Sequence, residues 1–499
     1  MSRTRQSWPQ VAPPLPWRPD LSRMAMRGRA VVQMRPGWTP ERIASHAGVL
    51  RGMAQANSTI DRGRLDQAIR RFSPRMRVTR AFEARVTAGT ARAHTGWDEL
   101  EESLGLSRVL RVEVDPDASV IALVDALRQL DVVESASPHY LCQTPFADRR
   151  VGDDLPPSWG HELIGAAAAL RQEPGDPTVI VAVVDSGVAL AHPEFRGRLR
   201  PGVDTVDLPP VQLSRAVSLE GDTTTLDLDA NDEVGHGSAC AGVIGARGLF
   251  AAPGVAGASP LQPVRTLARA RIAGRAEATA LGAICDIDVG LKRAVDLGAR
   301  VLNLSFGTPA SALSPGDPLP HAGVVDYAVA RGCLLVAAAG NAPGRTVYYP
   351  AAHPGVIAVG AIEPSGRPAE FSTRGDHVAL CAPGVSIYAP SIDGYGSVTG
   401  TSFAAPFVAG ACALLLARGY RRSTPVTTAL AREVLRASAR PFPAGVDHDG
   451  CGAGILDIPA ALAQLDHHLS QAETFGSTIS REPVTITACH AGGSPLARP

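Results

Sequence analysis

The sequence predicts an α/β protein with a mostly parallel central sheet, preceded by a small α+β domain. Beyond about residue 159, short apolar runs rich in β-branched residues alternate with helical stretches, which is typical of a parallel sheet covered by helices on both faces. Residues 29–145 alternate strand, helix, strand, helix and strand, the pattern of a small α+β domain. The chain of 499 residues is long enough for two domains, each with its own hydrophobic core.

The first domain is expected at residues 29–145, after a Pro- and Arg-rich leader at 1–28. Its first strand-like run, 30–34, leads into Thr39, which we expect to cap a short helix that begins at Pro40. The elements expected after it are helical stretches near 61–72 and 97–104, a strand at 107–114, an amphipathic helix at 118–130 and a strand at 132–137.

The second domain is expected at 159–468, after a linker rich in Pro and Asp at 146–158. Its buried strands are expected at 179–184, 301–304, 334–338, 356–359 and 378–380. The run from Phe403 to Ala417 is almost wholly apolar and has no polar face, so it predicts a buried helix. The tail at 469–499 is polar apart from one strand-like patch, Val484–Thr487, and we assign it no function.

Composition argues against several classes of function. Positive and negative side chains balance at 48 each, so binding to nucleic acid or to a membrane surface is not expected. No signal peptide is expected, because the N-terminus lacks a continuous apolar segment. No membrane span is expected either, because we find no segment that is long and apolar enough. The eight cysteines stand singly, without the spacing of metal ligands, and nothing demands a disulfide. We therefore expect a monomeric, cytoplasmic protein without an obligatory cofactor, with secretion by a non-obvious route as the alternative.

Polar residues follow several of the predicted strands, at the edge of the sheet where functional residues of such folds gather. Asp185 ends the first strand, Ser305-Phe306-Gly307 follow the second, and Asn341 follows the third. His236 lies between glycines at the start of another small-residue helix. Ser402 lies in what we expect to be a small, exposed turn before the long buried helix. Taken singly, each of these residues has a structural alternative as a helix cap or a turn residue.

Together, these residues supply the groups that nucleophilic catalysis by a serine needs. A hydroxyl becomes a good nucleophile when an imidazole accepts its proton, and the imidazole needs a carboxylate to fix its tautomer and stabilise its charge. Ser402, His236 and Asp185 supply these three groups. The free N–H groups and the dipole at a helix N-terminus favour a developing oxyanion, and Asn341 supplies a second donor. We expect Pro406 to be tolerated because the first helical turn does not need its N–H.

The segment from about Trp159 to Leu465 resembles the subtilisin-like (subtilase) serine proteases. Five motifs carry the resemblance, in the order found in that family. They are Val-Ala-Val-Val-Asp-Ser-Gly-Val at 181–188, Gly-His-Gly-Ser-Ala-Cys-Ala-Gly-Val-Ile-Gly at 235–245, Asn-Leu-Ser-Phe-Gly at 303–307, Ala-Ala-Ala-Gly-Asn at 337–341 and Gly-Thr-Ser-Phe-Ala-Ala-Pro at 400–406. The resemblance implies a three-layer subtilisin-like fold and a serine endopeptidase that works through an acyl-enzyme.

The same resemblance implies a role for each residue of the site. Asp185 would orient His236, which would act as general base and then as general acid, and Ser402 would form the acyl-enzyme. Asn341 and the Ser402 N–H would form the oxyanion hole. A peptide or protein substrate would pair with Ser305-Phe306-Gly307 as an added strand. The pocket for the residue before the cleaved bond would be bordered by Ala338, Ala339, Gly340 and the region near Tyr348.

Two departures from the family pattern affect what the resemblance implies. Ser238 stands where the family usually has Thr after Gly-His-Gly, and it keeps the hydroxyl. A polar insertion at about 205–233 ends in a dense run of Asp, Asn and Glu at 227–233, whose oxygens are of the type that binds calcium. The spacing does not match an EF-hand, so a solvated acidic loop is the alternative.

Residues 29–145 resemble, more loosely, the ferredoxin-like pro-domains that inhibit and chaperone proteases of this family. The likeness lies mainly in the exit segment Val132–Tyr140. The resemblance implies that the segment after Tyr140 lies in the substrate cleft like a bound product, and that cleavage within about 141–156 releases activity. A permanent accessory domain is the alternative.

Two other functions are compatible with the same motifs. A dedicated peptide-processing enzyme or ligase of narrow specificity would use the same catalytic residues, so only analysis of its products separates it from a general endopeptidase. A catalytically silent, peptide-binding regulator is the alternative from another class, and the complete set of catalytic groups argues against it.

Overall fold

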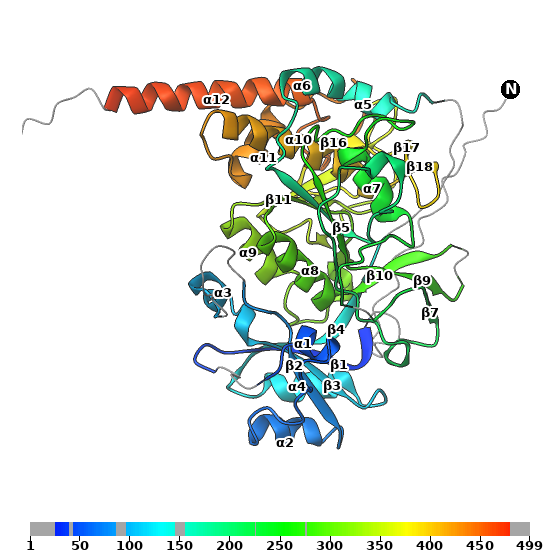
Figure 1. Cartoon of the computed structure of the whole chain (residues 1–499), viewed down its shortest axis with the longest axis vertical. Coiled ribbons are helices and arrows are strands. Elements are labelled where there is room, and N and C mark those ends of the chain that lie inside the picture. Colours follow the sequence, from blue (N-terminus) through cyan, green and yellow to red (C-terminus); the bar gives the residue numbers. More distant parts are fainter. Residues whose placement is uncertain are drawn as a thin grey trace, which may run out of the picture.

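The computed structural model describes residues 25–38, 43–85, 96–144, 155–224, 226–274 and 277–479, with side chains to residue 471. Two parts of the chain are distinct in Figure 1. The N-terminal part, coloured blue to cyan, lies below a larger part that carries the remaining elements. The helices α8 (Ile284–Asp296) and α9 (Ala322–Ala330) of the larger part lie toward the N-terminal part.

The larger part is built on a sheet of seven parallel strands in the order β16-β15-β13-β11-β5-β8-β6. The strands are β5 (Ile180–Asp185), β6 (Val203–Asp204), β8 (Leu261–Arg265), β11 (Ala299–Leu304), β13 (Leu334–Ala338), β15 (Val356–Ile362) and β16 (Val378–Pro383). The five strands expected from the apolar runs are therefore present, in one sheet.

Helices cover both faces of this sheet, which gives three layers. Within β5, Val181 and Val183 belong to the hydrophobic core shared with α7 (His236–Gly245) and α10 (Thr401–Arg421). Ala182 and Val184 belong to the core on the other face, which α8 and α9 complete. Successive side chains of a strand point to opposite faces, so a strand buried on both faces needs a continuous apolar run.

The N-terminal part is an antiparallel sheet with helices against it. Its strands β1 (Ala25–Met34), β2 (Met76–Arg80), β3 (Val109–Val114) and β4 (Val133–Gln143) have the order β2-β3-β1-β4. Its helices are α1 (His46–Leu50), α2 (Arg64–Arg70), α3 (Glu99–Ser103) and α4 (Val120–Arg128). Apolar residues of α2, α4 and all four strands form a separate core.

The two parts share one antiparallel sheet of seven strands in the order β2-β3-β1-β4-β10-β9-β7. The C-terminal end of β4 pairs with β10 (Thr279–Ala283), which continues through β9 (Ala268–Ile272) to β7 (Val217–Glu220), all antiparallel. Figure 1 shows β4 running from the N-terminal part up toward β10. The remaining elements are α5 (Trp159–Leu163), α6 (Ala166–Gln172), β12 (Thr308–Pro309), β14 (Tyr348–Tyr349), β17 (Ile387–Pro390), β18 (Tyr395–Val398), α11 (Thr428–Ala437) and α12 (Ile458–Ile479).

Several expected bounds differ from those observed. The first strand begins at Ala25, inside the leader expected at 1–28, and α12 continues to Ile479, beyond the domain end expected at 468. The sequence pattern missed β2, because three of its five residues are Arg or Thr, and β8, because Pro263 argues against a central strand. The expected helix start at Thr39 and Pro40, most of the linker and the patch Val484–Thr487 lie outside the described residues.

One helix of the described residues, α10, has the length and apolar composition of a membrane span. However, 94% of its most apolar window is buried inside the protein. Its composition is that of a core helix packed against the sheet.

Candidate active site

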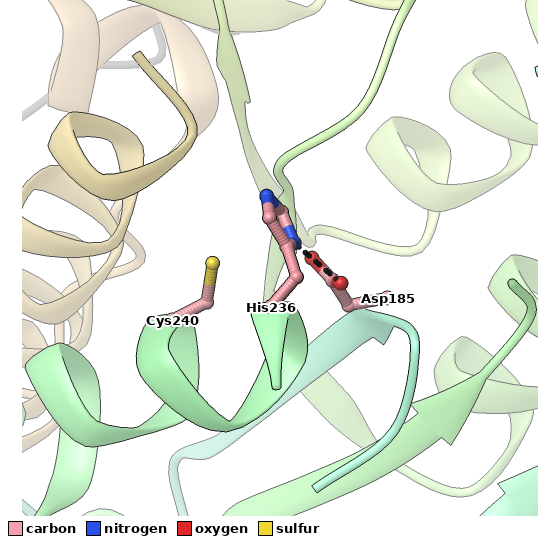
Figure 2. Close-up of side chains that lie close together, drawn as sticks. All are labelled: Asp185, His236 and Cys240. Atoms are coloured by element: carbon pink, nitrogen blue, oxygen red, sulfur yellow. Dashed lines mark hydrogen bonds and ion pairs between the residues drawn. The ribbon is translucent and has the colours of Figure 1, made fainter. Parts of the chain in front are cut away.

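A buried histidine and aspartate form the centre of the site (Figure 2). His236 is the first residue of α7, and Asp185 is the last residue of β5. Nδ1 of His236 lies 2.7 Å from Oδ1 of Asp185, and neither side chain is exposed to solvent. Because a carboxylate accepts hydrogen bonds, the proton of the neutral imidazole lies on Nδ1, and Nε2 keeps its lone pair. The imidazole is therefore in the tautomer that a general base requires.

The glycines around His236 allow α7 to approach β5 closely. Gly235 has φ of 98°, a left-handed conformation that turns the chain into the helix. A side chain at Gly237 would collide with the carbonyl oxygen of Gly187, in the turn that follows β5. The first glycine of the Gly-His-Gly motif is thus needed for its backbone conformation, and the second for the close contact with the turn after β5.

The carboxylate of Asp232 fixes the start of α7 against the turn after β5. It accepts hydrogen bonds from Ser186 Oγ at 2.9 Å and from Gly235 N at 2.9 Å, and Ser238 donates to it through both N–H and Oγ. Burial raises the pKa of Asp232, and these hydrogen bonds oppose that shift. The sequence interpretation placed Asp232 in the acidic loop and missed this role. The Ser238 hydroxyl is used here, at 2.7 Å from Asp232.

Ser402 does not lie in an exposed turn, contrary to the expectation. It is the second residue of α10 and is completely buried. Its Oγ donates to the carbonyl oxygen of Ser305 at 3.0 Å. The centroids of the His236 ring and of the ring of the next residue, Phe403, lie 5.1 Å apart. The start of α10, which holds Ser402, therefore lies next to His236.

Pro406 also has a different place from the one expected, since it lies beyond the first turn of α10. In a helix its N–H would bond to the carbonyl oxygen of Ser402, four residues earlier, and proline has no N–H. Two side chains satisfy that oxygen instead: Ser305 Oγ at 2.7 Å and Cys240 Sγ at 3.3 Å. The missing helical bond is therefore replaced by bonds that attach Ser402 to the residue after β11 and to α7.

The amide of Asn341 lies at the start of α10 with a fixed orientation. Its Oδ1 accepts from the N–H of Thr401 at 2.9 Å and from Thr401 Oγ1 at 2.7 Å. A backbone N–H must be met by an acceptor, so Oδ1 faces Thr401 and the Nδ2 donors face away. A donor pair next to the first turn of α10 is the arrangement that an oxyanion hole needs.

The end of β4 lies as a strand between the Ser305-Phe306-Gly307 segment and β10, and we call this strand position the groove. Gln143 forms an antiparallel bridge with Gly307 on one side and pairs with Leu281 of β10 on the other. The N–H of Thr144 donates to Ala280 O at 3.0 Å, and Thr279 Oγ1 donates to the carbonyl oxygen of Thr144 at 3.0 Å. The segment 141–144 is buried throughout. The chain's own N-terminal part thus supplies a strand between β10 and the Ser305–Gly307 segment.

The other residues predicted to contact substrate lie beside this groove. Ala338 and Ala339 are buried at the end of β13, and Gly340 follows with φ of 117°. A side chain at Gly340 would lie 2.5 Å from the Tyr348 ring, which also packs beside Gly307. The structure brings Gly340, Tyr348 and Gly307 together, and their predicted role in binding substrate stays a prediction.

The acidic run at 227–233 bonds mainly to its own surroundings. Asp227 and Asp229 accept from nearby backbone N–H groups, at 2.7 Å and 3.2 Å. Glu233 lies 2.9 Å from Arg265, and Asp232 is buried against α7. Calcium binding by this loop stays a prediction.

Cys240 lies one helical turn after His236, as Figure 2 shows. The potential metal-binding atoms of Asp185, His236 and Cys240 lie within 4.8 Å of one another. However, His236 Nδ1 carries the proton that bonds to Asp185, and burial raises the pKa of the Cys240 thiol well above its usual value. A protonated ring nitrogen and a protonated thiol are poor metal ligands. These three side chains are therefore poorly suited to hold a metal ion. The sequence analysis gave Cys240 no role at the site, although its position four residues after His236 places both side chains on one face of the helix.

Comparisons with known proteins point to one family. Residues 176–454 match the Subtilase family. The thermophilic serine proteinase of Bacillus sp. (strain AK1) is 34% identical over 309 residues, which cover 60% of this chain and 67% of that protein. A subtilisin of Bacillus pumilus is 31% identical over 309 residues, which cover 61% of this chain and 98% of that protein. A solved protease structure from Pseudoalteromonas arctica PAMC 21717 superposes with a TM-score of 0.52 at 25% identity, covering 62% of this chain and 97% of that one.

Proposed function

The chain belongs to the subtilase family, a family of serine peptidases, and from this premise we propose that Asp185, His236 and Ser402 form its catalytic triad. The observation that carries the proposal is the buried 2.7 Å bond between His236 Nδ1 and Asp185, next to the start of the helix that holds Ser402. Asn341 and the N–H of Ser402 would form the oxyanion hole.

The proposed reaction is acyl transfer from a peptide to Ser402. His236 Nε2 accepts the proton of Ser402 Oγ as that oxygen attacks the carbonyl carbon of the substrate. The negative charge of the tetrahedral intermediate is held by Asn341 Nδ2 and by the positive end of α10. His236 then gives its proton to the amine, which leaves as the C–N bond breaks. In the second half of the reaction His236 takes a proton from water, and the water oxygen attacks the acyl carbon. The bond to Ser402 Oγ then breaks, and His236 returns the proton to that oxygen. Before attack, the Ser402 hydroxyl must turn away from the carbonyl oxygen of Ser305, its partner at 3.0 Å.

The proposed substrate lies as an extended strand in the groove that residues 141–144 occupy. Main-chain pairing with Gly307 on one side and with β10 on the other supports this binding mode, because both edges offer backbone groups to any extended peptide. The peptidase would thus accept many sequences through the backbone, and side-chain pockets would give its preference.

We also propose that the protein is made as a self-inhibited zymogen. Residues 141–144 block the groove, which supports inhibition. The order β4-β1-β3-β2, with α2 between β1 and β2 and α4 between β3 and β4, supports a ferredoxin-like pro-domain. Thr144 is still paired with β10, so we place the bond that is cut after Thr144. The expected region of cleavage thus narrows from about 141–156 to the residues between 144 and about 157.

Fluorophosphonate labelling combined with N-terminal sequencing tests both proposals. Purified wild-type protein is expected to shorten, to acquire a new N-terminus within residues 145–156 and to become labelled at Ser402. The Ser402→Ala variant is expected to stay intact and unlabelled, whereas Ser365→Ala, at an exposed turn, should behave like the wild type.

The outcomes separate the two proposals. Wild-type protein that remains unlabelled after its N-terminal part has been cut off contradicts the triad. Full labelling and peptide hydrolysis by an intact chain contradict the zymogen and favour a permanent accessory domain.

A further inference from the structure

Two cysteines that are 70 positions apart in the sequence meet beside the last strand of the parallel sheet. Cys381 lies within β16, and Cys451 lies on the turn 447–452 that packs against this strand. Backbone bonds fix the packing: the N–H of Cys381 donates to Gly454 O at 2.8 Å, and the N–H of Leu456 donates to Cys381 O at 2.9 Å. The main chain therefore holds the two cysteines in a defined register.

The side chains of Cys381 and Cys451 lie in one small cluster. Sγ of Cys381 donates to the carbonyl oxygen of Cys451 at 3.2 Å. Ile362 and Ile455 complete the cluster. Cys381 and Cys451 are 1% and 2% exposed, but Asp447, His448 and Asp449, on the same turn as Cys451, are exposed. Cys451 therefore lies just beneath a turn that is itself at the surface.

The pair is asymmetric in its acidity. The neighbouring Cys381 side chain and the charge of Arg374 lower the pKa of the Cys451 thiol, although burial opposes them. The neighbouring Cys451 side chain and burial raise the pKa of Cys381. Thiols that respond to oxidants have thiolate character and stand next to a second thiol that resolves the first oxidation product.

We propose that Cys451 and Cys381 form a reversible modification site, in which a peroxide oxidises the pair to a disulfide. The Cys451 thiolate attacks one oxygen of the peroxide: the S–O bond forms, the O–O bond breaks, and hydroxide leaves and takes a proton. The Cys381 sulfur then attacks the sulfenic acid of Cys451: the S–S bond forms, the S–O bond breaks, and water leaves. The two thiols lose two electrons, and one hydrogen peroxide is reduced to two waters.

The position of the cross-link determines its effect. The loop between Cys381 and Cys451 contains all of α10, and with it Ser402. A disulfide across this loop restricts the unfolded chain and joins the turn 447–452 to β16. The oxidised protein is therefore the more stable form, and its melting temperature rises by roughly 5 °C or more. This inference does not depend on the catalytic proposal.

Mass spectrometry of the full chain tests the disulfide. Folded protein is treated with hydrogen peroxide and is then denatured. Its remaining thiols are alkylated with iodoacetamide, and its peptides are sequenced. We expect a peptide with Cys381 linked to a peptide with Cys451, and we expect dithiothreitol to separate them. Cys240 and Cys412 serve as internal controls, because both are completely buried and burial raises their pKa values. They should be alkylated in full after denaturation.

Two variants test the order of the steps. In Cys381→Ser, the sulfenic acid on Cys451 has no resolving thiol, so a dimedone adduct is expected there. In Cys451→Ser, Cys381 should stay reduced. Full alkylation of both cysteines in peroxide-treated wild-type protein would overturn the proposal, and so would a melting temperature that does not change when the link forms. A link from either cysteine to Cys240 or Cys412 would also overturn it.

Discussion

Ser305 Oγ donates a hydrogen bond of 2.7 Å to the carbonyl oxygen of Ser402, while Ser402 Oγ donates to the carbonyl oxygen of Ser305 at 3.0 Å. The two residues are thus bonded to each other in both directions. The first bond exists because Pro406 offers no N–H to that carbonyl. The position of the candidate nucleophile depends on the side chain of Ser305, which follows β11, and not on its own helix alone.

Ser305→Ala is expected to lower kcat about tenfold with little change in KM, because one hydrogen bond that positions Ser402 is lost while the backbone that pairs with substrate remains. Steady-state hydrolysis of a peptide ester checks the split between kcat and KM. Cys240→Val is the matched control: it removes only the weaker thiol bond at 3.3 Å, so its effect should be smaller. An unchanged kcat in Ser305→Ala would argue against the positioning role.

Asn341→Ala is expected to lower kcat by about 10²–10³ with little change in KM, because the donor acts on charge that develops in the transition state. The same change also removes the acceptor that holds Thr401, at 2.9 Å and 2.7 Å. Thr401→Val removes the hydroxyl bond to Asn341 and the acceptor of the Gly340 N–H, which lies 3.2 Å away, and it keeps the donor of Asn341. A loss in Thr401→Val as large as in Asn341→Ala would mean that Asn341 acts by anchoring the helix, not as an oxyanion donor.

Acid is expected to weaken the contact between the N-terminal part and the peptidase. Burial lowers the pKa of His46 to about 4, with a further contribution from Arg111, and burial and Arg111 lower the pKa of His139 well below its usual value. Both histidines take up protons more readily when the parts separate, so the complex weakens as pH falls from about 6.5 toward 4. His46 alone accounts for roughly a 30-fold weaker contact at pH 5.

One carboxylate of this interface acts in the opposite direction. Burial raises the pKa of Asp286 despite its bond of 2.5 Å to Arg111, so its protonation in the complex favours association below pH 6. Two histidines that favour separation act against this single group, so separation at low pH is the expected net result.

A Ser402→Ala protein with an inserted protease site between residues 145 and 154 provides the measurement. After cutting, gel filtration at pH 7.5 and at pH 5 reports whether the two parts co-elute. Co-elution at pH 7.5 and separation at pH 5 is the expected result. Replacing His46 with Gln and His139 with Met should reduce the pH dependence, whereas His448→Gln, at an exposed position, should leave it unchanged. Equal binding at both pH values would contradict the prediction.

Asp317→Ala is expected to speed the release of the N-terminal part by tenfold or more. The buried carboxylate of Asp317 bonds to both Arg128 and Tyr140, which belong to the N-terminal part, and its removal leaves both without this partner. The rate at which the shortened chain becomes labelled by a fluorophosphonate measures the release. Asp449→Ala, which breaks an exposed ion pair with Arg345, is the matched control. Equal rates in the two variants would contradict the role of Asp317.

The sequence predicted the parallel sheet because its strands are buried on both faces and must be continuously apolar. The prediction failed at β8, because Pro263 argues against a central strand. The neighbouring strand β6 pairs only with Val264 and Arg265, so Pro263 takes no part in that pairing. The prediction also failed at β2, where Arg77 and Arg80 conceal the alternation of buried side chains. Local composition predicts a strand poorly when the strand contains residues that are uncommon in strands and tertiary contacts accommodate them.

For the site, the sequence by itself determined which chemical groups are present and, through the family motifs, in what order they occur: Asp185, His236, Asn341 and Ser402. The glycine pattern around His236 also has a local steric reason, the close contact of Gly237 with the turn after β5.

Only the tertiary structure decided how these groups are supported and covered. Asp232 fixes α7, Ser305 and Cys240 satisfy the carbonyl oxygen of Ser402, and Gln143 pairs with Gly307 and with Leu281 of β10. The meeting of Cys381 with Cys451 is of the same kind. Each of these contacts joins segments that are far apart in the chain or belong to different elements. Periodicity and spacing report only on neighbours along the chain, so these contacts arise only when the sheet brings its strand ends together.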